Sequence, residues 1–138
     1  MSLPDAPQGG GPIVRVGDRT SVFDDRLTRW ICGVGAGLAG PGGGRFAWQR
    51  KLMDGGTCES SAYQRFGYRC AGMCLPLGNY HNMTDAGGIG PERIDLGDFQ
   101  STVRLLVALA ADRRRLGGTD RAIRKRFGRL LTEGRRLL

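Results

Sequence analysis

Residues 70–77 form a continuous apolar run with the sequence CAGMCLPL, and this run limits the possible folds more than any other segment. A strand that packs on both faces has this pattern, because neither face of it meets water. Such strands occur in sheets that are covered by helices on both sides. The run therefore predicts a central strand of an α/β domain, with a neighbouring strand on each side.

The segments around this run predict strands and helices in alternation. β-Branched and aromatic residues predict strands over residues 12–16 and 46–50. The spacing of apolar residues predicts helices that begin near Asp24 or Asp25, at Thr57 or Cys58, at Leu96 and at Thr119 or Asp120. This order is typical of an α/β sheet with helices packed on it.

The net charge of +8 divides the 138-residue chain into two parts. Residues 113–138 hold ten basic and two acidic residues, whereas residues 1–112 hold eleven of each and are neutral. Residues 1–11 end in three glycines, which predicts a flexible leader. We therefore expect a leader over residues 1–11, an α/β segment over residues 12–112 and a basic amphipathic helical tail over residues 113–138.

Residues 35–40 match the dinucleotide-binding pattern G-x-G-x-x-G. That pattern binds a cofactor only when a strand precedes it and a helix begins within it. Here a helical pattern precedes the glycines and a Pro-Gly loop follows them. We interpret these glycines as packing positions near the end of a helix.

The histidine and the cysteines allow two kinds of reactive site. A four-ligand zinc site would consist of Cys58, Cys70, Cys74 and His81, but only Cys70 and Cys74 come near the usual ligand spacing. Cys58 at a helix N-terminus could instead be a nucleophile with His81 as its base. Both hypotheses need contacts between distant segments, and core thiols are the simpler interpretation of Cys70 and Cys74.

Five groups of short motifs follow one another along the chain. They are residues 11–19 (GPIVRVGDR), 25–27 (DRL), 55–57 (GGT), Pro76 with Tyr80 and His81, and residues 95–98 (DLGD) with 102–106 (TVRLL). In this order they resemble the C-terminal part of the catalytic domain of co-catalytic zinc aminopeptidases. The group that they resemble most is the tetrahedral and glutamyl aminopeptidases, also called endoglucanase-like peptidases. The resemblance covers residues 11–112 and implies part of a three-layer, phosphorylase/hydrolase-like α/β fold.

The resemblance also implies a site. In the family the loop histidine is a zinc ligand, and His81 stands at that position. The residues that would flank the active site or bind substrate are Gly55, Gly56, Thr57, Cys58 and Tyr80. The family usually has Asp where this chain has Cys58, and Ser-Pro where it has Asn82 and Met83. These departures leave substrate preference open.

The other metal ligands of the family are a His-x-Asp, a bridging aspartate and a Glu-Glu pair, and all lie upstream of the matching region. This chain has one histidine, three glutamates and no Glu-Glu pair. Two-metal hydrolysis needs such groups to hold both ions. We therefore expect the C-terminal portion of a zinc aminopeptidase that cleaves N-terminal peptide bonds, inactive as this chain alone and binding zinc weakly at most.

The alternative is a non-catalytic interaction module whose basic tail binds nucleic acid or an acidic partner. The tail contains one aromatic residue, Phe127, which lies on its apolar stripe, so base stacking has little support. No apolar run has the about 18 residues of a membrane span, and the N-terminus does not resemble a secretory signal. We expect a cytoplasmic protein with no membrane partner, with homo-oligomers as one way to cover sheet edges.

Overall fold

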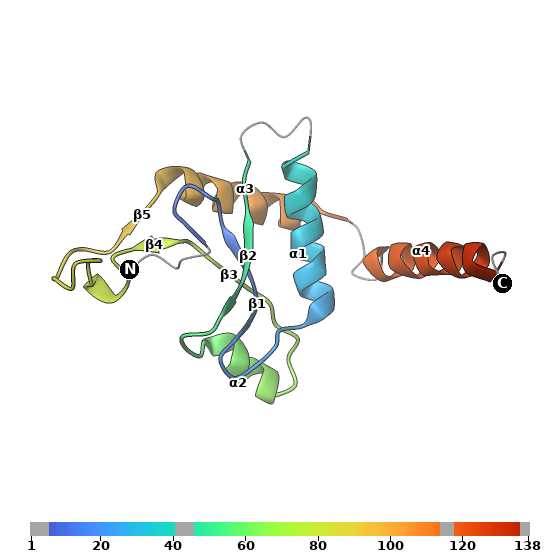
Figure 1. Ribbon diagram of the computed structural model, residues 1–138, viewed down its shortest axis with the longest axis horizontal. Coiled ribbons are helices and arrows are strands. Elements are labelled where there is room, and N and C mark those ends of the chain that lie inside the picture. The colour runs from blue at the N-terminus through green and yellow to red at the C-terminus, as the bar shows by residue number, and fades with distance from the viewer. Residues whose placement is uncertain (1–5, 41–45, 114–117, 136–138) are drawn as a thin grey trace.

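The computed structural model describes residues 6–40, 46–113 and 118–135 (Figure 1). The elements, in chain order, are β1 (Ile13–Asp18), α1 (Asp25–Leu38), β2 (Gln49–Met53), α2 (Glu59–Arg65), β3 (Gly72–Cys74), β4 (Leu77–Gly78), the 3-10 turn η1 (Tyr80–Asn82), β5 (Arg93–Ile94), α3 (Leu96–Ala111) and α4 (Gly118–Arg135). The predicted mixed α/β class is confirmed.

Strand β1 is the middle strand of a three-stranded sheet with the order β2-β1-β3. It pairs in parallel with β2, with Ile13 opposite Gln49. It pairs antiparallel with β3, with Ile13 opposite Cys74. The parallel pair is possible because α1 carries the chain back between the two strands, whereas an antiparallel pair needs no such crossover.

The two faces of β1 have different roles. Val14 is fully buried and packs with α1 and α3, whose contributions to this cluster include Ile31, Val34, Leu105 and Leu109. Successive side chains of a strand point to opposite faces, so Arg15 points away from this core. The hydrophobic core therefore lies between the sheet and these two helices, which leaves the opposite face for other contacts.

The prediction of a central, doubly buried strand over residues 70–77 is wrong. Only Gly72–Cys74 forms a strand in the three-stranded sheet; it is an edge strand and its three residues are half-buried. Leu77 and Gly78 belong to a different sheet, where they pair with β5. Pro76 lies between the two strands and has no N–H to donate, which ends regular pairing there.

The second strand lies three residues later than residues 46–50, the range that the sequence predicts. Phe46 is buried in the core and Trp48 packs against the core. These aromatic side chains therefore contribute to the core from the segment that precedes the strand. Trp48 also lies against Gly35 of α1. A Cβ on Gly35 would be 3.2 Å from the Trp48 ring, which confirms the interpretation of Gly35 as a packing position.

Aspartate side chains cap the N-termini of two of the helices. The Asp24 side chain accepts a hydrogen bond from the N–H of Leu27 at the start of α1, and Asp95 accepts one from the N–H of Asp98 at the start of α3. Each cap satisfies one of the backbone donors that a helix leaves free at its N-terminus. The helix start that the sequence predicts at Asp24 or Asp25 is confirmed.

Residues 6–11 are part of the folded domain, so the prediction of a flexible leader is wrong for the part of it that the structure describes. Ala6 is buried, and the carboxylate of Asp98 accepts hydrogen bonds from the N–H groups of Gly9 (2.8 Å) and Gly11 (2.7 Å). Gly11 has a φ of +83°, and a Cβ there would lie 1.9 Å from the carbonyl oxygen of Ala47. Only glycine fits this position.

Helix α4 extends from the end of the domain and is labelled at the right of Figure 1. Its apolar residues Phe127, Leu130 and Leu131 are each more than half exposed. None of the helices in the described part of the chain is long and apolar enough to cross a membrane.

We expect Asp98→Ala to destabilise the protein by about 3 kcal/mol, because it removes two hydrogen bonds to a buried carboxylate and leaves two backbone donors without their acceptor. The measurement is urea unfolding of the variant and the parent protein. Asp25→Ala is the control, because Asp25 forms an exposed pair with Arg29 on α1 and should change stability by less than about 1 kcal/mol. Equal effects of the two substitutions would contradict the assigned role of Asp98.

Candidate functional site

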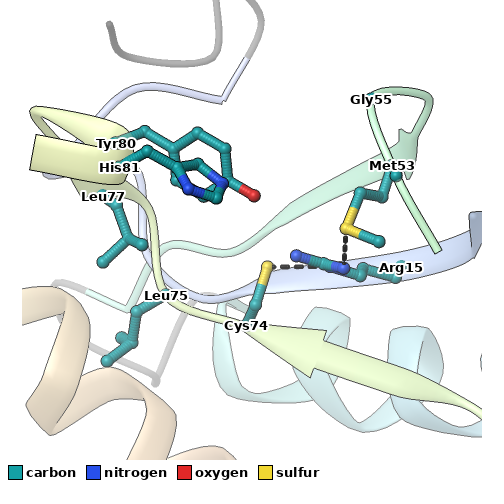
Figure 2. A pocket seen from close by; sticks show the side chains of 9 residues that line it. Arg15, Met53, Gly55, Cys74, Leu75, Leu77, Tyr80 and His81 are labelled. Carbon is teal, nitrogen blue, oxygen red and sulfur yellow. Dashed lines mark hydrogen bonds between the residues drawn. The ribbon is translucent and has the colours of Figure 1, made fainter. Parts of the chain in front are cut away.

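A cavity of about 130 Å³ lies on the side of β1 to which Arg15 points (Figure 2). It is bordered by the end of β2, by the loop after β2 and by the chain from β3 to η1. Its lining residues are Arg15, Met53, Gly55, Gly56, Cys74, Leu75, Leu77, Tyr80 and His81.

This cavity brings together four of the six residues that the resemblance singles out. Gly55 and Gly56 both line the cavity, and Figure 2 shows Tyr80 and His81 across from Gly55. The two pairs are separated by more than twenty residues in the sequence, and the sheet brings them to one cavity. Thr57 and Cys58 do not line it.

His81 lies at the rim of the cavity and is exposed. Its ring meets the ring of Tyr80 edge to face, with the centroids 4.1 Å apart. Within the described part of the chain, neither ring nitrogen of His81 forms a hydrogen bond. The imidazole is therefore free to bind a metal ion or a ligand.

The backbone of the histidine loop is strained. Asn79, His81 and Asn82 have φ values of 53°, 59° and 59°, in the left-handed region that residues with a side chain seldom adopt. Such strain persists only where neighbouring contacts hold it, and it is frequent at functional sites. Here the Glu92 carboxylate accepts a hydrogen bond of 2.7 Å from the N–H of His81, and the Asn82 side chain accepts one from the N–H of Glu92.

Asp18, at the end of β1, fixes the loops at the other end of the site. Its carboxylate is buried and accepts hydrogen bonds from the N–H groups of Thr20 and Ser21 (2.9 Å each) and of Cys58 (2.8 Å). The Ser61 hydroxyl donates another. Burial by itself raises the pKa of Asp18, but the bonds from Ser61, Cys58 and Thr20 together outweigh it and hold the pKa well below its usual range.

These bonds explain where Thr57 and Cys58 lie. Cys58 is the N-cap residue of α2, and its N–H points to Asp18. The Thr57 hydroxyl lies 3.4 Å from the Thr20 hydroxyl. In the described structure no contact joins the Cys58 thiol to His81, so the geometry gives no support to a Cys58–His81 catalytic pair.

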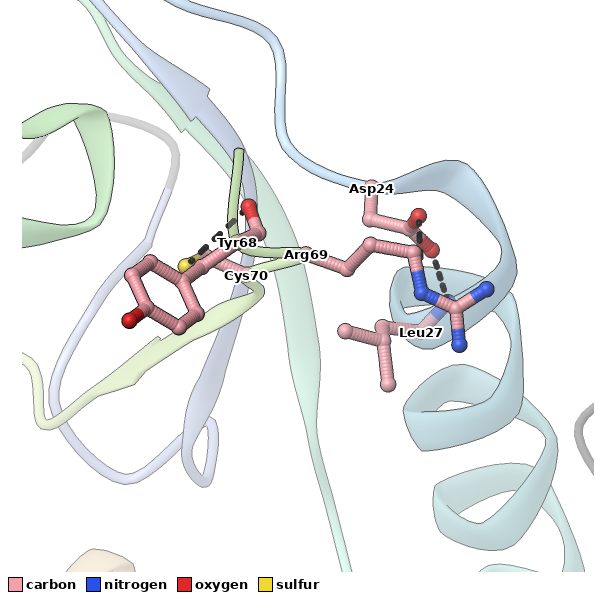
Figure 3. Close-up of polar contacts among 5 residues, drawn as sticks. All are labelled: Asp24, Leu27, Tyr68, Arg69 and Cys70. Carbon is pink, nitrogen blue, oxygen red and sulfur yellow. Dashed lines mark hydrogen bonds and ion pairs between the residues drawn. The ribbon is translucent and has the colours of Figure 1, made fainter. Parts of the chain in front are cut away.

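The proposed zinc ligands also lie apart. Cys74 accepts a hydrogen bond from Arg15 inside the cavity. The Cys70 thiol faces the carbonyl of Tyr68 at 3.8 Å, in a segment where Arg69 lies 3.9 Å from Asp24 of the α1 cap (Figure 3). Among the described residues, no three His, Cys, Asp or Glu side chains are close enough to hold a metal ion together. These residues alone do not fit a complete zinc site.

Sequence reasoning missed two residues of this site, Arg15 and Asp18. Both belong to the motif over residues 11–19, but the sequence gives no sign of their roles. The burial of Asp18 depends on the turn after β1 and on α2. The position of Arg15 in the cavity depends on β1 being the middle strand. A charged residue inside a β-branched strand was the available signal, because such a residue must face away from the core.

Comparison with known proteins gives matches among solved structures. No protein-family model and no curated protein sequence matches the chain. The PhTET1-12s dodecamer matches with a TM-score of 0.58 and 24% identity, over 78% of this chain and 28% of that one. The TET aminopeptidase from the marine sediment archaeon Thaumarchaeota archaeon SCGC AB-539-E09 matches with a TM-score of 0.59 and 18% identity, over 74% and 26%. About three quarters of this chain therefore has a fold similar to that of about a quarter of each matched chain.

We expect Asp18→Asn to destabilise the protein by about 2–3 kcal/mol at neutral pH, because the amide replaces a charged acceptor and adds two donors that face other donors. The pKa of Asp18 is lowered in the folded state. Its stabilisation is therefore complete above the unfolded pKa of about 3.9 and is lost as the pH falls below it.

Urea unfolding between neutral pH and about pH 3 measures this effect. The difference between the parent protein and Asp18→Asn should shrink as the pH falls, whereas Asp25→Asn should stay close to the parent throughout, because Asp25 is exposed. A difference that does not depend on pH would contradict the role of the ionised carboxylate.

Proposed function

We propose that this chain forms part of the active site of a metal-dependent aminopeptidase, with His81 as one zinc ligand. The observation that carries the proposal is the cavity in which Gly55 and Gly56 meet Tyr80 and His81. The fold shared with TET aminopeptidases supports it. Zinc, when bound, would supply a Lewis acid that activates water. In this chain His81 would hold the ion, and Glu92 would fix the backbone of the histidine loop.

The isolated chain is inactive in this proposal. A catalytic zinc site takes three protein ligands, and the described residues offer a single free imidazole at the cavity. The remaining ligands would come from segments like those that make up the rest of the matched structures, of which this chain spans 28% and 26%. Aminopeptidase turnover by the 138-residue chain alone would contradict this part of the proposal.

Three finer features belong to the same proposal. The sheet would be one layer of a three-layer fold, with further structure covering the face that carries Arg15. Copies of the chain would associate, and the exposed apolar side chains Phe99, Val103 and Leu106 of α3 offer a surface for this. PhTET1-12s is a dodecamer, which supports association as a property of this fold. The peptide substrate and a cytoplasmic location remain predictions.

We expect zinc to bind weakly and to shift the ring signals of His81 in NMR spectra. Because His81 is the only histidine, its imidazole signals need no assignment. Zinc can also bind the cysteines, so Cys74→Ser is the control variant and should leave the His81 shift unchanged. An unperturbed His81 ring at saturating zinc would contradict its role as a ligand.

A second function rests on α4. This helix carries the exposed basic residues Arg121, Arg124, Lys125, Arg126, Arg129 and Arg135. Clustered cations on one helix attract phosphate backbones and acidic surfaces. In this alternative the chain is a non-catalytic interaction module, and the cavity has no catalytic role.

A salt titration of binding to nonspecific DNA tests this alternative. If α4 contacts phosphates, log K should fall linearly with log salt, with a slope of about −0.9 for each contact. Replacing Arg124 and Arg129 with Gln should then reduce the slope by about 2. Arg19→Gln with Arg65→Gln is the matched control, because both arginines are exposed on the domain. Absence of salt-dependent binding would exclude a nucleic-acid function for the tail.

A further inference from the structure

Helix α4 exposes an apolar stripe along one side. Ile123, Phe127, Leu130 and Leu131 recur at the i, i+4, i+7 and i+8 spacing of a single helix face. Phe127, Leu130 and Leu131 are 65%, 52% and 60% exposed, and Ile123 is half-buried. Exposed apolar side chains that gather on one face mark a surface that binds a partner. The stripe therefore needs an apolar cover, which the described part of the chain does not supply.

The other faces of α4 are basic. Its 18 residues include six basic and two acidic ones, whereas residues 1–112 carry no net charge. Helical spacing places Arg124 and Arg126 at the two borders of the stripe. Arg121, Lys125 and Arg129 lie on the opposite face, and all five side chains are exposed. The partner that covers the stripe should therefore have an apolar layer with negative charge beside it.

We propose that α4 binds the surface of an anionic lipid membrane, with the helix axis in the plane of that surface. Helices that lie in the membrane interface have one face with Phe and Leu side chains and another that is rich in Arg and Lys. Phe127, Leu130 and Leu131 enter the boundary between the headgroups and the acyl chains. Arg124 and Arg126 reach the lipid phosphates from the borders of the stripe, because a long side chain can bury its stem while its charge stays in water.

A membrane accounts for both faces of α4, whereas nucleic acid accounts for one. Phosphate backbones attract the basic residues but leave the apolar stripe in water. A second copy of α4 could cover the stripe, but it would bring like charges together at Arg124 and Arg126, which is unfavourable. Binding at the membrane surface needs no spanning helix. The expectation that this protein has no membrane partner therefore does not hold for this mode of binding.

Co-sedimentation of the full 138-residue chain with lipid vesicles tests the proposal. Vesicles that contain phosphatidylserine in phosphatidylcholine should bind the chain about tenfold or more tightly than vesicles of phosphatidylcholine alone, because each basic residue near the surface adds to the attraction. Added salt should weaken the binding, because it screens this attraction. Equal binding to the two kinds of vesicle, or binding to neither, would overturn the proposal.

A double serine variant separates insertion of the stripe from attraction of charge alone. Phe127→Ser with Leu131→Ser keeps every charge and should weaken binding to the anionic vesicles about tenfold or more, because two apolar side chains no longer leave water. Phe66→Ser with Ile89→Ser is the matched control. Phe66 and Ile89 are 83% and 96% exposed and lie outside α4, so this variant should bind like the parent protein. Parent-like binding by the α4 serine variant would overturn the proposal.

Two further measurements identify a different occupant of the stripe. Sedimentation equilibrium without lipid gives the mass of the particle, and a larger particle that the α4 serine variant dissociates would show that a second copy covers the stripe. DNA binding that this variant retains, with no binding to vesicles, would assign α4 to nucleic acid. Either result would overturn the proposal. These measurements need neither zinc nor His81, so their failure is distinct from failure of the peptidase function.

Discussion

The carboxylate of Asp18 is the interaction on which the arrangement of the site depends. It stands at the end of the central strand and binds donors from the turn that follows and from the first turn of α2. Since α2 follows the loop with Gly55 and Gly56, the carboxylate joins that loop to β1. The N–H of Arg19 adds a backbone hydrogen bond to the carbonyl of Gly56. A buried charge with several donors is rigid, because each donor would lose its acceptor if the group moved.

The two faces of β1 make different contacts: one packs in the core, and the other faces the cavity. Val14 packs in the core with α1 and α3, and its neighbour Arg15 reaches the cavity. The pleat of a strand makes this separation unavoidable, because adjacent side chains cannot share a face. The core can therefore be apolar throughout while the other face carries charge, and the histidine loop closes that face from the side of β3.

Much of the local structure follows from the sequence, and the larger errors have a common origin. A capping carboxylate predicts where α1 begins and helical spacing predicts where α3 begins, because those signals act within a few residues. The apolar run over residues 70–77 predicts a buried central strand and instead contains an edge strand, Pro76 and the start of a second sheet. The apolar composition of a segment predicts that it is shielded from water. It does not predict which strands or helices the segment packs against.

The sequence by itself determined the α/β class and the start of α1, and it predicted a site that includes Gly55, Gly56, Tyr80 and His81. Gly55, Gly56, Tyr80 and His81 are recognisable because short motifs carry them. Only the tertiary structure decided that Arg15 enters this cavity, that Asp98 holds residues 9–11 and that Cys58 turns toward Asp18. Those contacts join residues 38 or more positions apart, and neither helical or strand propensity nor apolar periodicity predicts which distant groups come together.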